Sequence, residues 1–191
     1  MDLNIWMIIG AYFLGAVPFG LLIGRWVKGV DVRELGSGNI GASNVSRACG
    51  RGWGRLTLCL DASKGALPVL LSLQDSTGLA SAVGLAAILG HCFPIWLRFQ
   101  GGKGVATTAG AVGALAPQAT AVAVVVWWLA YRLSGISAVG SLMACAGLLV
   151  ALWGLEPEGL SLGVAAVAVV LLRHRENLRR LLEGTENRSN L

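Results

Sequence analysis

The feature that most constrains this chain is a series of long stretches without a charged residue. The uncharged stretches are residues 3–24, 65–74, 76–97, 104–131, 133–155 and 159–172. A helix needs about 20 apolar residues to cross a bilayer, because each residue adds about 1.5 Å to its length. Several stretches reach that length. The chain is therefore predicted to be an all-α polytopic membrane protein.

The composition supports this prediction. Of the 191 residues, 55% are hydrophobic and 13% are charged, whereas soluble domains carry about 25% charged residues. The mean hydropathy of +0.69 excludes a disordered chain and disfavours a soluble globule. The 27 glycines suit close helix packing in lipid. The length fits one integral-membrane domain over residues 1–191.

Two stretches do not match one span each. Stretch 65–74 is too short, and its extension back to Leu56 brings Asp61 and Lys64 onto one helix face. Stretch 104–131 is too long, and a turn at Pro117 divides it into two short helices. The chain is thus predicted to cross the membrane about seven times, over residues 3–25, 56–74, 77–97, 104–116, 118–132, 134–154 and 159–172.

The basic residues indicate the orientation. With seven crossings, all 15 Lys and Arg lie on or near the cytoplasmic side, and the outer side holds only Asp2, Asp75, Glu156 and Glu158. A single crossing at 104–131 would put Arg132 and the basic tail outside. We therefore expect an outside N-terminus and a cytoplasmic C-terminus. A re-entrant hairpin at 104–131 would satisfy the charge distribution equally well.

The cysteines and histidines do not form a metal-binding pattern. The four cysteines at 49, 59, 92 and 145 lack a Cys-x-x-Cys spacing, and the two histidines do not complete a usual site with them. We expect no metal and no disulfide.

The first polar cluster is the segment GSGNIGASNVSR at 36–47. Its glycines match a dinucleotide fingerprint formally, but no parallel sheet can accompany it in a helical chain. Backbone N–H groups in such a segment can converge on an anion. A flexible loop that caps the next helix is the alternative. The groups suited to an anion are Ser37, Gly38, Asn39, Gly41 and Arg47.

The second cluster is RFQGGKG at 98–104. Lys103 follows Gly102 and opens a predicted helix, whose N-terminal dipole also favours an anion. The segment is not a Walker A loop, because Val105 stands where Ser or Thr is required. The alternative is an ordinary lysine of a cytoplasmic loop. The preceding His91 is expected to be structural.

The third cluster is RHRENLRR at 173–180. His174 and Asn177 share a helix face by their spacing, whereas Arg179 and Arg180 are expected to contact anionic lipid. Within the predicted spans, Asp61 and Lys64 either form an internal ion pair or place Lys64 at the edge of the site.

These segments resemble the acyl-phosphate:glycerol-3-phosphate acyltransferase family, PlsY. The matching motifs are GSGNIGASNVSR at 36–47, DASKG at 61–65, GHCFPIWLRFQGGKGVAT at 90–107 and RHRENLRRLLEGTE at 173–186. The resemblance implies a multi-pass enzyme of the bacterial inner membrane with a cytoplasmic active site. Such an enzyme acylates the 1-hydroxyl of sn-glycerol 3-phosphate with acyl phosphate, giving lysophosphatidic acid and phosphate. It uses no acyl-CoA, acyl carrier protein, metal or other cofactor.

The resemblance also implies site residues and partners. The family's site residues carry over to Ser37, Asn39, Arg47, Lys103, His174 and Asn177, with Lys64 as a neighbour. Membrane lipid and the phosphate acyltransferase that makes acyl phosphate are the expected partners, and nucleic acid is not.

The residue types fit these roles. The phosphate-binding set is predicted to be Gly38, Gly41, Arg47, Lys64, Gly102 and Lys103, and the catalytic set Ser37, Asn39, His174 and Asn177. Cations balance phosphate charge, and uncharged donors hold hydroxyls or a tetrahedral oxyanion. His174 is expected to position a substrate while the phosphate of the acyl donor accepts the proton.

A second function stays open at this point. A small membrane transporter or exchanger of a phosphorylated metabolite would suit the short helices and the intramembrane charges Asp61 and Lys64. Such a protein needs a site near the midplane of the membrane. The polar clusters here are all predicted on one side, which favours the enzyme.

Overall fold

The computed structural model describes residues 3–188, and all regular structure in that range is helical. The α-helices are α1 Leu3–Gly15, α2 Phe19–Lys28, α3 Ala42–Cys49, α4 Arg51–Ser72, α5 Thr77–Cys92, α6 Val105–Leu115, α7 Pro117–Ser134, α8 Ser137–Leu155, α9 Leu160–Arg173 and α10 Arg175–Leu182. Three short 3₁₀ helices lie at Val32–Glu34, Ile95–Leu97 and Pro157–Gly159.

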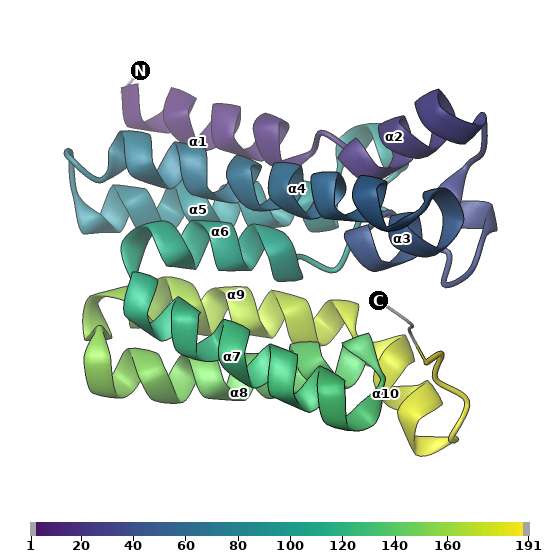
Figure 1. The fold of residues 1–191 in the computed structure, drawn as a ribbon. Helices are drawn as coiled ribbons and strands as arrows, with labels where there is room; N and C mark the ends of the chain where they lie inside the picture. Colours follow the sequence, from purple (N-terminus) through teal and green to yellow (C-terminus); the bar gives the residue numbers. More distant parts are fainter. Residues whose placement is uncertain (1–2, 189–191) are drawn as a thin grey trace.

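The long helices run back and forth along one common direction. Figure 1 shows α1, α4, α5 and α6 together in one half and α7, α8 and α9 in the other. The start of α1 and the turns α4–α5, α6–α7 and α8–α9 lie at one end of this bundle. The helices α2, α3 and α10 gather at the opposite end. The three polar clusters are thereby brought to the same end.

Prolines set two of the helix boundaries. The predicted turn within 104–131 is confirmed, because α6 ends at Leu115 and Pro117 opens α7, a position where its missing N–H costs nothing. The prediction of one helix over 3–25 is wrong in detail. The helix stops at Gly15 and restarts at Phe19 after Pro18, since proline restricts the residue before it and lacks a donor.

Glycines let neighbouring helices touch through their backbones. A Cβ on Gly65 of α4 would collide with the carbonyl of Thr107 in α6, and one on Gly110 of α6 would collide with that of Ala62. The same reciprocal contact joins α1 and α5 through Gly15 and Gly90. Small residues are the usual means of close helix packing in lipid, so these contacts fix α4 against α6 and α1 against α5.

The charges inside α4 form an ion pair. Lys64 Nζ lies 2.8 Å from Asp61 Oδ1, and both side chains are almost inaccessible. The ammonium also donates a hydrogen bond of 2.8 Å to the carbonyl oxygen of Val17. Of the two predicted alternatives, the internal pair is therefore the one observed. Burial without such partners would cost several kcal/mol per ion, roughly.

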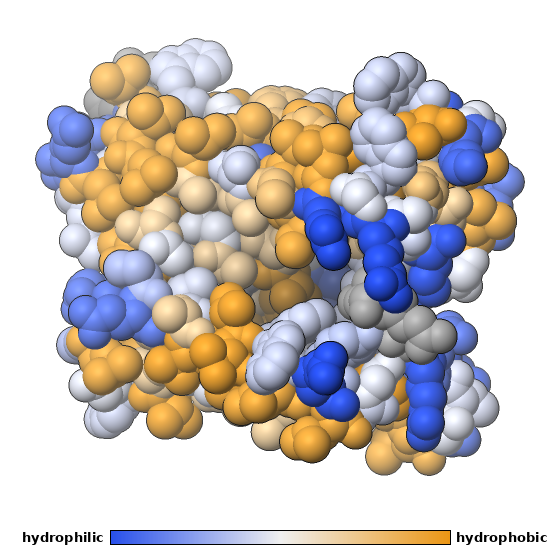
Figure 2. Space-filling model, viewed as in Figure 1, coloured by the Kyte–Doolittle hydropathy of each residue, from blue (hydrophilic) through white to orange (hydrophobic). Residues whose placement is uncertain are grey.

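The surface is suited to lipid. Three helical segments are long and apolar enough to cross a membrane, namely Leu3–Lys28, Thr77–Leu97 and Ser137–Leu155. A fourth candidate is the pair Pro157–Arg173 and Arg175–Leu182, bent by 56°. Figure 2 shows a largely apolar surface along the helices and a hollow between α4 and α7, with strongly hydrophilic residues beside it. The chain is an integral membrane protein.

Candidate active site

A cavity of about 150 Å³ lies where the three polar clusters meet. The predicted site residues that line it are Ser37, Asn39, Gly41, Arg47, Lys103, His174 and Asn177. Gly38, Lys64 and Gly102 are not in its lining. Their roles in phosphate binding stay predictions that no contact in the structure supports, and Lys64 is already engaged by Asp61.

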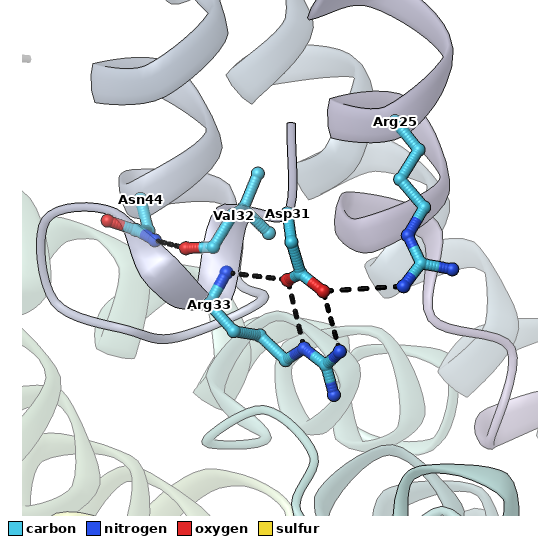
Figure 3. Close-up of polar contacts among 5 residues, drawn as sticks. All are labelled: Arg25, Asp31, Val32, Arg33 and Asn44. Carbon is cyan, nitrogen blue, oxygen red and sulfur yellow. Dashed lines mark hydrogen bonds and ion pairs between the residues drawn. The ribbon is translucent and has the colours of Figure 1, made fainter. Parts of the chain in front are cut away.

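Asn44 organises the glycine-rich loop. Its side chain is buried, and Nδ2 lies 2.7–3.0 Å from the carbonyl oxygens of Val32, Leu35 and Asn39. Figure 3 shows the bond to Val32. Its Oδ1 accepts a hydrogen bond of 3.0 Å from the backbone N–H of Ser37. One buried amide thus closes a loop that has no regular hydrogen bonding of its own.

The loop presents Ser37, Asn39 and Arg47 from one side of the cavity. Arg47 donates to Ser37 Oγ at 3.2 Å, so the guanidinium and the hydroxyl act as a unit. Asn39 Oδ1 accepts from the N–H of Gly41 at 2.8 Å, just before α3, which leaves the amide nitrogen as its remaining donor group. Burial lowers the pKa of Arg47, and the charge of Glu186 opposes that effect.

A surface ion pair holds the segment that precedes this loop. Asp31 Oδ2 lies 2.6 Å from Arg33 and 3.3 Å from Arg25 (Figure 3). Hydrogen bonds from Arg33 hold the pKa of the Asp31 carboxyl well below its usual range. Asp31 also caps the short helix Val32–Glu34 by accepting from the N–H of Arg33 at 3.0 Å. The backbone around Val32 is therefore held on one side by Asp31 and on the other by the hydrogen bonds of Asn44.

Arg173 positions the loop that carries Lys103. It donates to the carbonyl oxygens of Gly101 at 2.7 Å and Gly102 at 3.0 Å. Gly104, with φ of 83°, turns the chain into α6 in a conformation that glycine adopts most readily. Gly102 packs so closely on the ring of His91 that no side chain would fit between them. These contacts direct Lys103 into the cavity.

Lys103 is a cation without a close partner in the part of the chain that the structure describes. Among residues 3–188, no group forms a hydrogen bond or close ion pair with its ammonium. Burial lowers its pKa to about 8, opposed by the charge of Glu186. The ordinary lysine value is about 10.4, so a bound anion would restore the charge that burial disfavours.

His174 lies between the end of α9 and the start of α10. It is 1% exposed, and Nδ1 lies 2.8 Å from the carbonyl oxygen of Val170. A carbonyl can only accept, so Nδ1 carries the proton and Nε2 is an acceptor in the neutral ring. Burial lowers the pKa of His174 to about 4. The imidazole is therefore neutral at physiological pH and a weak base.

Several cavity residues were missed by the sequence analysis. The lining also includes Ser43, Asn44, Asp61, His91, Ser137 and Glu186. His91 Nδ1 lies 3.6 Å from Asp61 Oδ1 and has no hydrogen-bond partner among residues 3–188, so its structural role stays a prediction. Ser43 and Ser137 approach each other to 3.2 Å through their hydroxyls, joining α3 to α8. The only signal for Glu186 was its place at the end of the fourth matching motif, 173–186.

A second, apolar cavity of about 80 Å³ adjoins the first. Both are lined by Val105, Trp127 and Ser141. The second extends between α6, α7, α8 and α9 toward Leu148 and Val170. A ligand with a phosphate at one end and an apolar chain at the other matches this pair of cavities. Within the described part of the chain, no cluster of three metal-ligating side chains occurs.

Comparisons with known proteins agree with this geometry. The family model described as glycerol-3-phosphate acyltransferase matches residues 5–184. The glycerol-3-phosphate acyltransferase of Myxococcus xanthus is 46% identical over 187 residues, covering 95% of this chain and 97% of that protein. Glycerol-3-phosphate acyltransferase 2 of Thermotoga maritima is 40% identical over 185 residues, covering 94% and 93%.

Solved structures extend the likeness to the fold. The crystal structure of PlsY (YgiH), an integral membrane glycerol 3-phosphate acyltransferase, in its glycerol 3-phosphate form has a TM-score of 0.92 and 38% identity, covering 98% of this chain and 96% of that one. Its lysophosphatidic acid form has a TM-score of 0.89 and 37% identity, covering 98% and 95%. The chain therefore belongs to the glycerol-3-phosphate acyltransferase family.

Proposed function

We propose that this protein transfers a fatty acyl group from acyl phosphate to the 1-hydroxyl of sn-glycerol 3-phosphate, giving lysophosphatidic acid and inorganic phosphate. Family membership and the two ligand forms of the solved PlsY support the acceptor and the product. The observation that carries the proposal is the meeting of Arg47, Lys103 and His174 in one cavity beside an apolar one.

The site binds phosphate through charge and hydrogen bonds. Lys103 has no close partner among residues 3–188, and Arg47, in the last turn of α3, lines the same cavity. Each charge-assisted hydrogen bond contributes on the order of 1.5–3 kcal/mol. The apolar cavity between α6 and α9 receives the start of the acyl chain, so the acyl carbonyl lies at the border of the two cavities.

The reaction needs no covalent enzyme intermediate. The 1-hydroxyl oxygen attacks the acyl carbonyl carbon, the new ester C–O bond forms, and the bond to the phosphate oxygen breaks. Phosphate leaves with the proton of the hydroxyl, because its pKa of roughly 6 exceeds the value of about 4 for His174. His174 holds the attacking hydroxyl in place, and Ser37 and Asn39 stabilise the developing oxyanion.

The proposal includes an orientation in the bacterial inner membrane. Helices α4, α6, α7 and α9 run alongside the three clear candidate spans (Figure 1), which supports about seven crossings. The end with α2, α3 and α10 is rich in Lys and Arg and is assigned to the cytoplasm. The soluble phosphate acyltransferase that makes acyl phosphate would deliver its product there.

Purified protein given acyl phosphate and glycerol 3-phosphate should release phosphate and form lysophosphatidic acid. Arg47→Ala and Lys103→Ala should each remove most of this activity, because each deletes a charge from the phosphate site. Arg55→Ala, the same change at an exposed position of α4, is the matched control. Lys103→Arg should rescue poorly, since the loop accommodates a compact ammonium better than a planar guanidinium. Near-normal turnover of both alanine variants at low substrate would refute the phosphate site.

A cysteine-labelling experiment tests the orientation. In a background without the four native cysteines, Asp75→Cys and Glu183→Cys should react with an impermeant reagent from opposite sides of the membrane. Asp75 lies in the α4–α5 turn and Glu183 follows α10, and both are exposed. Labelling of both from one side would contradict seven crossings.

The role of His174 predicts a particular pH profile. His174→Gln, which keeps a hydrogen-bonding group but cannot titrate, should retain more activity than His174→Ala. The acid limb of its pH–rate profile should persist, because that limb belongs to the substrate phosphate. The decisive measurement is kcat/KM between pH 5 and 8 for both variants. If the acid limb disappears in His174→Gln and kcat/KM falls by about 10²- to 10⁴-fold, the histidine is the base.

A further inference from the structure

Glu186 is an acid placed inside the candidate active site. It follows α10 in the tail, its side chain is 7% exposed, and it lines the polar cavity. Its Oε2 accepts a hydrogen bond of 2.7 Å from Arg180 Nε, and its Oε1 accepts one of 2.8 Å from Asn177 Nδ2. The tail thus folds back and joins Arg180 to Asn177 through one carboxylate.

This carboxylate decides which way the amide of Asn177 faces. An ionised carboxylate can only accept hydrogen bonds, so the nitrogen of Asn177 must turn toward Glu186 and its oxygen away from it. Asn177 is 1% exposed. Its Oδ1 has no hydrogen-bond partner in the part of the chain that the structure describes. A buried acceptor of this kind is costly unless a ligand supplies the missing donor.

His174 provides a second acceptor in the same cavity. Its Nδ1 is occupied by the carbonyl of Val170, so Nε2 is the acceptor of the neutral ring. Glycerol 3-phosphate carries two hydroxyl donors, at C1 and C2. In the proposed mechanism His174 holds the attacking C1 hydroxyl, and the leaving phosphate takes its proton. The C2 hydroxyl keeps its proton and is left for the other acceptor, Oδ1 of Asn177.

We propose that Glu186 is a positioning residue that sets substrate specificity: it holds Asn177 with Oδ1 toward the C2 substituent, so that the site accepts a C2 hydroxyl and rejects a C2 ketone. This inference rests on the proposed function. A ketone oxygen can only accept, and two acceptors facing each other leave both unsatisfied. Sites built to bind a hydroxyl discriminate strongly for this reason.

The variant Glu186→Gln should invert the polarity of the whole chain of hydrogen bonds. Arg180 can only donate, so the oxygen of the new amide stays with Arg180 and its nitrogen turns to Asn177. Asn177 must then offer its oxygen to that nitrogen and turn its own nitrogen into the cavity. A donor would now face the C2 position, where a ketone can accept from it.

The experiment compares kcat/KM for glycerol 3-phosphate and for its C2 ketone analogue, dihydroxyacetone phosphate, with the same acyl phosphate. The unaltered protein should prefer the alcohol by about 10- to 100-fold, the factor expected for one unsatisfied buried pair. Glu186→Gln should reduce this ratio by about tenfold or more. Glu183→Gln, which alters an exposed carboxylate paired with Arg179, should leave the ratio unchanged.

The double variant Asn177→Asp with Glu186→Gln should restore the ratio. In this variant the carboxylate is at position 177 and the amide is at position 186, so the net charge is unchanged. The amide nitrogen at 186 still donates to the side chain at 177. The second carboxylate oxygen at 177 is an acceptor that faces the cavity again. It also carries the test if the single variant does not fold. A purely structural role would slow both substrates equally.

Two results would overturn the inference. The first is a Glu186→Gln ratio within about twofold of the unaltered protein. The second, decisive if Glu186→Gln does not fold, is a double variant that has lost the preference. Absence of turnover of glycerol 3-phosphate by the unaltered protein would refute the proposed function itself.

Discussion

The structure of the site depends on the hydrogen bonds from Arg173 to the carbonyl oxygens of Gly101 and Gly102. They tie the end of α9 to the loop before α6, two segments about 70 residues apart in sequence. They act together with the backbone hydrogen bonds from Gly101 to Cys92 and from Gly102 to His91. This support matters because glycine loses the most conformational freedom on ordering, and it keeps Lys103 and His174 at one cavity. Asn44 performs the same task for the first loop through its four hydrogen bonds to backbone groups.

The location of the cavity favours an enzyme over a transporter as the function of this protein. It lies at one end of the bundle, among α3, α10 and the loops, whereas alternating access requires a site near the midplane. The charges of α4 that could have lined a transport path instead neutralise each other, with Lys64 bound to Asp61 and Val17. The apolar cavity beside the polar one suits an amphiphilic acyl donor.

Much of the fold and of the site could be predicted from sequence, and the exceptions have physical reasons. The break at Pro117 was predictable because proline both stops and starts helices, but the break at Pro18 was hidden by a run of apolar residues. Lys64 was carried over from the family resemblance as a neighbour of the site, and only the folded chain shows its ion pair with Asp61 and its hydrogen bond to Val17. Glu186 was missed because a carboxylate after a basic helix resembles a solvated tail, and only the folded chain brings it to Asn177.

Calorimetry of glycerol 3-phosphate binding tests the central claim, that Lys103 is the unsatisfied cation of a phosphate site. Its pKa of about 8 in the unliganded protein should rise when phosphate binds, so binding at pH 8 should take up about half a proton. Titrations in buffers of different ionisation enthalpy measure this proton uptake. The contribution of Lys103 should decrease toward pH 6, because the lysine is already charged there. The proton exchange of the ligand's own phosphate is measured in parallel with Lys103→Arg. At pH 8 the uptake should be absent in Lys103→Arg. Binding at pH 8 without proton uptake, or equal uptake in Lys103→Arg, would contradict the account.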